Sequence, residues 1–222
     1  MIGHRGVKDL APENTLVSIK KAFELGLRWV EVDVKISQDN IPILLHDDTL
    51  DRTTNGSGTP TNFNYSKLKK LDAGKFFYRT STDINIPTLD SVILFCKEKN
   101  IGLNIELKPN NGFEKKNILA IANLFKNYNF DIPHYFSSFD FMSIIELKKL
   151  LPKSSYGILI DNFDKKITLE KLFFFCRKYT INYCGINKNI LNQELVSKIK
   201  NNNLVITAFS DKNFNLKEAE TL

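Results

Sequence analysis

Hydrophobic and polar residues alternate along residues 29–48, WVEVDVKISQDNIPILLHDD, in the pattern of two strands joined by a tight reversal. In the first strand, valines at every second position alternate with Glu31 and Asp33. Successive side chains of a strand point to opposite faces, so one face is apolar and the other is acidic. Two carboxylates on one face repel each other, and we therefore expect a positive group between them.

The reversal of this predicted hairpin falls at residues 39–40, where an asparagine tolerates positive φ better than most residues do. A two-residue turn at this point pairs Asp33 with His46 and Glu31 with Asp48. A register shifted by one residue breaks this arrangement, because it moves every side chain to the other face. The pattern thus predicts a diacid and a histidine on one wall of a site.

The remaining pattern predicts a repeated alternation of strands and helices. Residues 1–4 form the stub of a strand, and a helix over 16–25 begins at a cap, Asn14 or Thr15, and ends at Gly26. Further strands are expected at 101–108, 135–139, 155–160, 183–187 and 204–209. Helices are expected over 113–128, 141–151, 168–179 and 191–200, and two more are expected to begin at 89 and near Phe214. The polar stretch 51–85, with one short helix over 65–71, is long enough to suggest a functional excursion.

Repeated strand–helix units without a glycine-rich nucleotide fingerprint favour an α/β fold of the TIM (β/α)₈ barrel type. The prediction is one domain over residues 1–222, with a small cap inserted at about 51–85. Only seven parallel strands are found, and no eighth strand precedes Leu222, so the barrel is expected to lack its last strand. Without that strand, two sheet edges would be exposed.

The composition fits a globular cytoplasmic protein. Of the 222 residues, 42% are hydrophobic, and no apolar run approaches the roughly 20 residues that cross a bilayer. A cleavable signal peptide is not expected, because a site-like His4-Arg5-Gly6 begins almost at once. The three cysteines lack metal or disulfide spacing, which favours reduced core thiols. The net charge of +6 permits an anionic partner, but the scattered basic residues and the lack of a binding motif argue against nucleic acid.

Three carboxylates are candidates for a metal site. Glu31, Asp33 and Glu106 lie near the ends of predicted parallel strands, and barrel chemistry takes place at that face. Their oxygen atoms suit a hard divalent cation such as Mg²⁺ or Ca²⁺. Each acid taken singly is as often a partner of a nearby lysine or arginine, whereas three acids at one mouth favour the metal. A zinc site is not indicated, because no His/Cys cluster has the required spacing.

Two of the three histidines accompany these acids. His4 ends the first strand and His46 faces the acids, whereas His134 precedes a strand and is expected at the far end in a structural role. A histidine pair suits general acid–base catalysis near neutral pH. Arg5 and Lys108 supply positive charge for a phosphate group. Cleavage of a phosphodiester is the chemistry that uses this set of groups.

At these residues the chain resembles the glycerophosphodiester phosphodiesterase family, in particular its small cytosolic bacterial members. The resemblance covers roughly the first half of the chain closely, and Ser137-Ser138-Phe139 extends it more weakly. The matching stretches are His4-Arg5-Gly6, Ala11-Pro12-Glu13-Asn14-Thr15, Glu31-Val32-Asp33, His46-Asp47-Asp48, Arg52-Thr53-Thr54-Asn55-Gly56 and Asn104-Ile105-Glu106-Leu107-Lys108.

The resemblance implies a TIM barrel with a small cap and a hydrolase that converts glycerophosphodiesters to glycerol 3-phosphate and an alcohol. It implies dependence on a divalent cation, Mg²⁺ or Ca²⁺. The residues that match the family's functional positions are Glu31, Asp33 and Glu106 for the metal, His4 and His46 for acid–base catalysis, and Arg5 and Lys108 for the phosphate. The expected partner is a small-molecule glycerophosphodiester, with no nucleic acid and no stable membrane insertion.

An alternative interpretation follows from the missing strand: a truncated, inactive barrel kept as an anion-binding or interaction module. The sequence leaves open the preferred alcohol group, the cation, which histidine is the base, and the oligomeric state, a homodimer included. Whether the chain folds and is active without a final strand is open as well.

Overall fold

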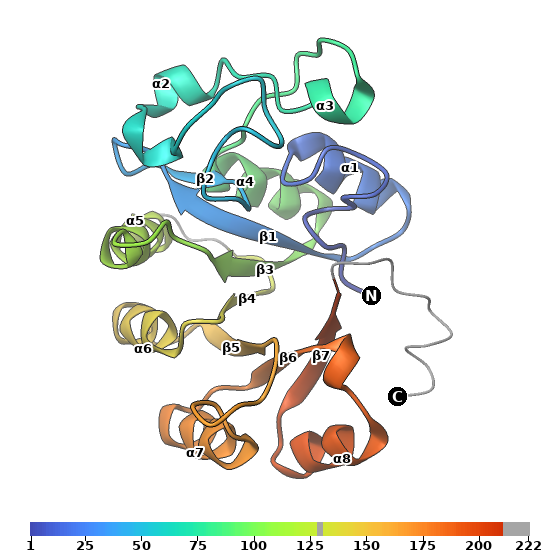
Figure 1. Ribbon diagram of the computed structural model, residues 1–222, viewed down its shortest axis with the longest axis vertical. Coiled ribbons are helices and arrows are strands. Elements are labelled where there is room, and N and C mark those ends of the chain that lie inside the picture. Colours follow the sequence, from blue (N-terminus) through green and yellow to red (C-terminus); the bar gives the residue numbers. More distant parts are fainter. Residues whose placement is uncertain (128–130, 211–222) are drawn as a thin grey trace.

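In the computed structural model, which describes residues 1–127 and 131–210, the chain forms one curved sheet with helices along its outer side (Figure 1). The seven strands lie in the order β2-β1-β3-β4-β5-β6-β7. The strand bounds are β1 Trp29–Ile36, β2 Pro42–Leu44, β3 Gly102–Leu107, β4 His134–Ser138, β5 Ser155–Ile160, β6 Tyr183–Asn187 and β7 Val205–Phe209. All neighbours from β1 to β7 pair in parallel, and β2 is antiparallel to β1.

The helices follow the strands in the βα order that the sequence predicts. Their bounds are α1 Leu16–Glu24, α2 Tyr65–Leu68, α3 Lys75–Tyr78, α4 Leu89–Lys99, α5 Glu114–Asn127, α6 Phe141–Leu150, α7 Leu169–Tyr179 and α8 Gln193–Asn201, with single 3₁₀ turns at η1 Pro60–Asn62 and η2 Lys188–Ile190. Thr15 is the N-cap of α1, since its side chain accepts a hydrogen bond from the Ser18 N–H, and Gly26 has a φ of +83° just after this helix. No helix among these residues is long and apolar enough to cross a membrane.

The two faces of the sheet differ sharply in chemistry. Alternate residues such as Val32, Ile105 and Ile158 are fully buried in one large core between the sheet and its helices. The opposite, concave face carries the intervening residues, among them Glu31 and Glu106. Polar groups therefore project into the interior of the curved sheet, while the apolar faces of the helices stabilise it from outside.

The parallel strands that the sequence predicts are present, and the first is a stub. Gly3 makes an isolated parallel bridge to Val30, so the stub joins the N-terminal half of β1 while β2 pairs with its C-terminal half. Together with β1 and β3 to β7 this makes the seven parallel strands of an α/β barrel-type sheet. Within residues 1–127 and 131–210, no bridge joins β7 to the stub. The helix expected near Phe214 lies outside the described residues.

The predicted register of the hairpin was wrong by one residue. Val34 pairs with Leu44, and the Leu45 N–H donates to the Asp33 carbonyl, so Asp33 lies opposite Leu45 and not opposite His46. The loop has three residues instead of two, because Asn40 takes a left-handed conformation with φ of +57° and adds a bulge to the turn. His46 reaches the concave face because the chain leaves the sheet after Leu44.

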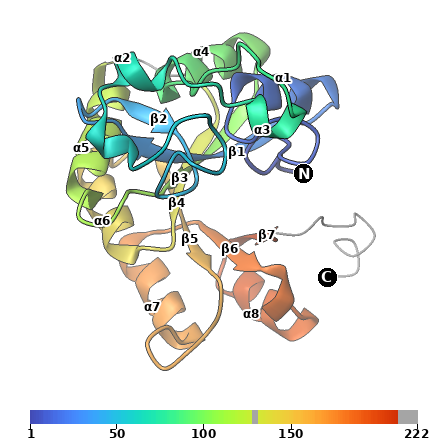
Figure 2. The same ribbon diagram turned by 45° about the horizontal axis from the view of Figure 1, so that its top comes forward.

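Residues 51–85, called here the 51–85 segment, contain η1, α2 and α3 and lie over β2 and α1 in both views (Figures 1 and 2). This segment has a small core separate from the main one. Its buried apolar side chains, Leu68 and Ala73, pack with Ile43 and Leu45 from the second arm of the hairpin. The segment is thereby attached to the same hairpin arm that delivers His46.

Candidate active site

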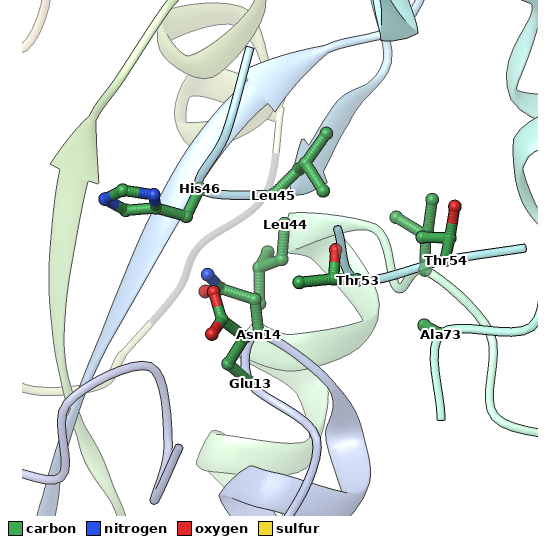
Figure 3. A pocket seen from close by; sticks show the side chains of 9 residues that line it. Glu13, Asn14, Leu44, Leu45, His46, Thr53, Thr54 and Ala73 are labelled. Atoms are coloured by element: carbon green, nitrogen blue, oxygen red, sulfur yellow. The ribbon is translucent and has the colours of Figure 1, made fainter. Parts of the chain in front are cut away.

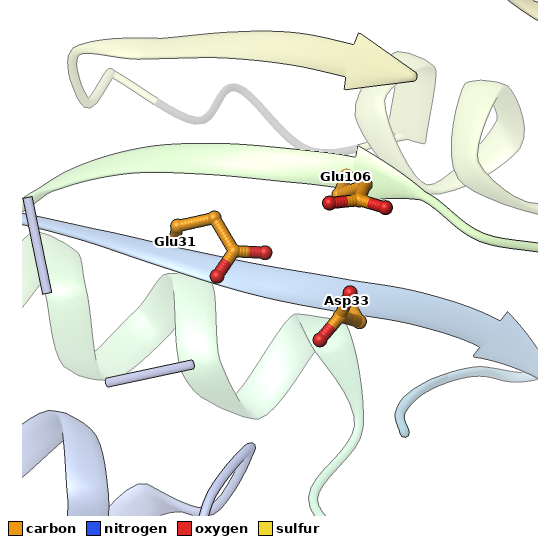
Figure 4. A group of neighbouring side chains, drawn as sticks. All are labelled: Glu31, Asp33 and Glu106. Carbon is orange, nitrogen blue, oxygen red and sulfur yellow. The ribbon is translucent and has the colours of Figure 1, made fainter. Parts of the chain in front are cut away.

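Three buried acids converge where β1 and β3 run side by side (Figure 4). Asp33 pairs in register with Glu106, and Glu31 lies two residues earlier on the same face of β1. Each side chain offers a carboxylate oxygen, and these atoms all lie within 4.8 Å of one another. Parallel register thus brings acids from distant parts of the sequence into one cluster.

The electrostatics of this cluster call for a cation. Burial raises the pKa of Glu31 well above its usual range, and the neighbouring Asp33 and Glu106 carboxylates add to the effect. Burial and the Asp33 charge raise the pKa of Glu106 to about 7, against the opposing influence of Lys108. The Oε1 atom of Glu31 is buried with no hydrogen-bond partner. An oxygen-only donor set with an unsatisfied carboxylate atom fits a hard divalent cation.

Arg5 and Lys108 lie within this acidic cluster. The Arg5 guanidinium is buried, with Nη1 2.9 Å from Glu13 Oε1 and Nε 3.3 Å from Asp33 Oδ2. The Nζ atom of Lys108 lies 2.9 Å from Glu106 Oε1 and 3.7 Å from Asp33 Oδ1. These two cations are the positive groups expected beside the diacid, and they offer donors to a phosphate.

Asn14 is a site residue that sequence reasoning missed, since it was considered only as a helix cap. It takes a left-handed conformation with φ of +55° and leaves the capping of α1 to Thr15. Its Nδ2 donates to Asp33 Oδ2 at 2.8 Å, and its Oδ1 accepts from the Asp33 N–H at 3.1 Å. This reciprocal pair fixes the Asp33 carboxylate. The pairing joins residues far apart in the sequence, and only the motif around Asn14 hinted at it.

The two histidines have different surroundings. His4 Nε2 lies 3.9 Å from Glu31 Oε2. His46 Nδ1 lies 2.7 Å from Asp47 Oδ1, and burial lowers the pKa of His46 while the Asp33 charge and the Asp47 contact oppose that shift. His134 begins β4 at the opposite end of the sheet, with Nδ1 2.9 Å from the Ile132 carbonyl, as expected for a structural residue.

A salt-bridge network supports His46 from behind, and sequence reasoning also missed it. Arg52, from the 51–85 segment, donates to both Asp47 and Glu13 through contacts between 2.6 and 2.9 Å. Burial alone would raise the pKa of Glu13, but the hydrogen bonds and charges of Arg52 and Arg5 lower it to about 2. Asp47 contacts His46, and Glu13 contacts Arg5. Arg52 therefore links the acid that contacts His46 to the acid that contacts the buried Arg5.

A second supporting network lies at the ends of β1 and β3. Lys35 has only 1% of its surface exposed, and its Nζ donates to Asp48 Oδ1 at 3.0 Å and to the Lys108 carbonyl at 2.9 Å. Asn110 Nδ2 donates to the Asp48 carbonyl at 2.9 Å. Burial lowers the pKa of Lys35 and Asp48 opposes the shift. The network ties the chain after His46 to the end of β3. Lys35 lies two residues after Asp33 in β1, and its partners come from separate loops.

A cavity of about 10 Å³ lies between the hairpin and the 51–85 segment (Figure 3). Glu13, His46 and Ala73 are among its lining residues. It is too small for a substrate and marks the tight contact between the segment and the wall that carries His46. The larger cavity, of about 300 Å³, lies elsewhere, between Pro42, Thr88 and α5, away from the acids.

The remaining concave face, from β4 to β7, is aromatic and weakly polar. Tyr135 stacks on Tyr183 with ring centroids 4.3 Å apart, and Trp29 lies 5.9 Å from Tyr135. Nearer the strand ends, Phe139 meets Phe209 edge-to-face at 5.5 Å. Substrate that reaches the acids would have a polar wall on one side and an aromatic wall on the other.

Comparison with known proteins points to one family. The pattern of the Glycerophosphoryl diester phosphodiesterase family matches residues 4–218. A glycerophosphodiester phosphodiesterase of Caldanaerobacter subterraneus is 39% identical over 163 residues. The matched region is 72% of this chain and 65% of that relative's length. A putative glycerophosphodiester phosphodiesterase of Bacillus subtilis is 33% identical over 96% of this chain and 86% of its own.

The solved structures agree with this result. An Oleispira antarctica phosphodiesterase, determined in complex with the product sn-glycerol-3-phosphate, superposes with a TM-score of 0.87 at 33% identity, covering 96% of this chain and 84% of its own. The α/β barrel-type fold that the sequence predicts is therefore confirmed by both the strand topology and this neighbour.

Proposed function

Since this chain belongs to the glycerophosphoryl diester phosphodiesterase family, we propose that it hydrolyses glycerophosphodiesters to glycerol 3-phosphate and an alcohol. The observation that carries this proposal is the convergence of three buried acids, two histidines and two cations on one end of the concave face. A phosphodiester needs this combination, because its cleavage requires stabilisation of phosphoryl oxygens and a proton transfer at each end.

For the proton transfers we assign His46 as the base and His4 as the acid. The Asp47 carboxylate lies 2.7 Å from Nδ1 of His46 and would hold a proton there, and burial lowers the pKa of the ring, so Nε2 would offer its lone pair. In the proposed reaction, His46 takes the proton of the attacking hydroxyl, of water or of the substrate glycerol. The oxygen forms a bond to phosphorus, the bond to the alcohol oxygen breaks, and His4 protonates the departing oxygen. Attack by the glycerol hydroxyl gives a cyclic phosphate, which water then opens.

The remaining residues hold the phosphate and the cation. Arg5 and Lys108 offer donors to non-bridging oxygens, the arginine as a fork and the lysine as a point charge. Glu31, Asp33 and Glu106 would hold a divalent cation, Mg²⁺ or Ca²⁺, which supplies electrostatic stabilisation of phosphoryl charge when bound. The buried Glu31 Oε1 without a partner supports this assignment, because such an atom costs free energy unless a ligand satisfies it. We also propose that the 51–85 segment acts as a cap on the wall that carries His46.

The test is a coupled assay for glycerol 3-phosphate released from glycerophosphocholine. We expect turnover that EDTA abolishes and Mg²⁺ or Ca²⁺ restores. His46→Ala should reduce the rate by about 10²–10⁴-fold, because a general base contributes that much. His134→Ala is the matched control and should keep the rate once its folded fraction is corrected for. Equal rates in the two variants would refute the assignment of His46. No turnover by the folded wild-type chain would favour an inactive binding module.

A cytoplasmic location is proposed on the basis of the three cysteines. All three are free and buried, and burial raises the pKa of Cys96 to about 12, so these thiols are unreactive core residues. Fractionation of cells that express the tagged chain measures the location. Recovery only from an oxidising compartment would contradict it.

A further inference from the structure

We propose that an exposed aromatic turn on the 51–85 segment, Phe76, Phe77 and Tyr78, docks the protein on an anionic lipid surface. The inference does not rest on the proposed hydrolysis, because none of these side chains belongs to the catalytic site. It concerns where the protein works and not which bond it cleaves.

The first argument is exposure. Phe76 is 53%, Phe77 40% and Tyr78 45% exposed, and every residue over 75–81 is exposed. Phe77 and Tyr78 contact each other edge-to-face, with ring centroids 5.0 Å apart. Single exposed apolar residues are common on protein surfaces, but three consecutive aromatic residues form a patch of the kind that marks an interaction site.

The second argument is that hydrogen bonds at the base of the loop fix the position of the aromatic turn on the protein surface. The carboxylate of the buried Asp72 accepts hydrogen bonds from the N–H groups of Gly74 and Lys75, both at 2.9 Å, and from Thr82 N–H at 2.6 Å. A backbone bond of 2.7 Å from Ala73 N–H to the Ile84 carbonyl closes the base of the loop. One buried carboxylate therefore joins both ends of the excursion, and the aromatic turn cannot fold back onto the surface without breaking these bonds.

The third argument is charge. Lys75 and Arg79 flank the aromatic turn and are both exposed. Over residues 63–81 there are five lysine or arginine residues and a single acid, the buried and fully bonded Asp72. The protein as a whole carries a charge of +6, which adds long-range attraction to an anionic surface.

These features fit a lipid headgroup layer better than other occupants. Aromatic rings favour the membrane–water interface, and flanking lysine or arginine side chains pair with lipid phosphates. Single-stranded nucleic acid is usually held in an extended basic groove, with bases stacked on spaced rings, whereas the rings here are consecutive on one turn.

The turn is also connected to the candidate active site. Ala73, at the base of the loop, lines the small cavity that His46 and Glu13 also line (Figure 3). Docking through the turn would therefore hold the His46 side of the protein close to the lipid surface, where lipid-derived phosphodiesters are released.

The experiment is sedimentation of the full chain with vesicles of phosphatidylcholine alone or with about 30 mol% phosphatidylglycerol. We expect binding to the anionic vesicles that weakens as salt rises, and much weaker binding to phosphatidylcholine. The triple variant Phe76→Ser/Phe77→Ser/Tyr78→Ser should lower partitioning about tenfold or more. The matched control is Phe174→Ser on α7, where Phe174 is 62% exposed beside Lys178 while its two phenylalanine neighbours are partly buried and pack against the core. It should bind like the wild type.

A second variant tests the charge independently of the rings. Lys75→Gln/Arg79→Gln should lower binding to anionic vesicles about tenfold or more and leave binding to phosphatidylcholine unchanged. Both variants should keep the wild-type melting temperature and the wild-type rate on soluble glycerophosphocholine. Equal vesicle binding by the wild type and the triple variant would overturn the proposal. A dimer that the triple variant loses would assign the turn to a second copy, and a shift with single-stranded DNA that it loses would assign the turn to nucleic acid; either result replaces the lipid surface.

Discussion

The two walls of the concave face differ in the charge of the side chains that they bury. The wall formed by β1, β3 and the loops beside them buries three carboxylates whose oxygen atoms lie within 4.8 Å of one another, together with Arg5 and Lys35. On the wall from β4 to β7, the buried Tyr135 stacks on the partly buried Tyr183, and small residues such as Ser137 and Gly157 are buried. On the first wall, burial raises the pKa of Glu31 and of Glu106. Asp161, at the end of β5 on the second wall, is exposed and accepts a hydrogen bond from Asn187 Nδ2 at 2.6 Å.

Charged groups are thus concentrated on one wall of the sheet, and apolar groups on the other. Buried charge costs folding free energy unless it is paired, so its concentration on one wall makes that wall the candidate site of chemistry. The aromatic wall gains free energy from apolar burial. Both walls use the same parallel register, and only the inward-facing residue types distinguish them.

The largest expected effect comes from removing one acid of the first wall. Glu106→Gln keeps the shape of the side chain but removes a charge and a cation ligand. We expect turnover of glycerophosphocholine to fall about 10³-fold, equivalent to ~4 kcal/mol of transition-state stabilisation. Asp161→Asn, an acid at the same end of the aromatic wall, should change turnover less than about twofold. A comparable loss in both variants would mean that catalysis is not confined to the first wall.

The stability of the cation-free protein should depend on pH through the same acids. In the folded state the pKa of Glu106 is raised from 4.5 to about 7, and that of Glu31 is raised as well. The folded chain therefore binds more protons than the unfolded chain in this window, and stability falls as pH rises through it. For Glu106 the loss is on the order of 3 kcal/mol.

Thermal unfolding in EDTA measures this loss directly. We expect the melting temperature to fall between about pH 5 and pH 7.5, and Mg²⁺ or Ca²⁺ to restore it at the higher pH with little effect at the lower. Glu106→Gln should flatten the EDTA profile. A profile that rises over this range and is unchanged by the substitution would show that the first wall does not carry the electrostatic cost.

A smaller effect is expected from Arg52, which acts through Asp47 and not on the substrate. Arg52→Ala should lower kcat about tenfold with little change in KM, because a loosened His46 reduces the population of productive geometries. The nitrogen chemical shifts of His46 should show a mixture of tautomers where the wild type has one. Arg52→Lys should rescue kcat only in part, since a lysine cannot bridge two carboxylates as a fork does.

The control for this prediction is Arg177→Ala on α7. Arg177 also bonds across elements, to Asn202 at 3.1 Å, but lies outside the concave face. Its loss should leave kcat and the His46 signals unchanged. A tenfold fall there as well would show that kcat responds to surface arginines in general and not to the support of His46.

Much of the fold could be predicted from the chain because hydrophobic periodicity is a local property. The alternation in β1, the start of α4 at Leu89 and the run of βα units all appear in the sequence and are present in the structure. The hairpin was harder. Whether Asn40 forms part of a two-residue or a three-residue loop shifts the register by one, and the competing turn types have similar local free energies. Packing of Leu45 into the small core beneath the 51–85 segment accompanies the observed choice.

The sequence by itself determined which residue types are available and which face of each strand they occupy, because period-two geometry follows from the chain's covalent structure. It placed Glu31, Asp33 and Glu106 on inward faces of parallel strands, although it could not measure their separation. Only the tertiary structure decided that these acids meet within 4.8 Å and that Asn14 and Arg52 hold the groups around them. Those contacts join residues up to 75 positions apart. These contacts stabilise the protein only in the folded state, where the sheet brings the residues together and excludes water.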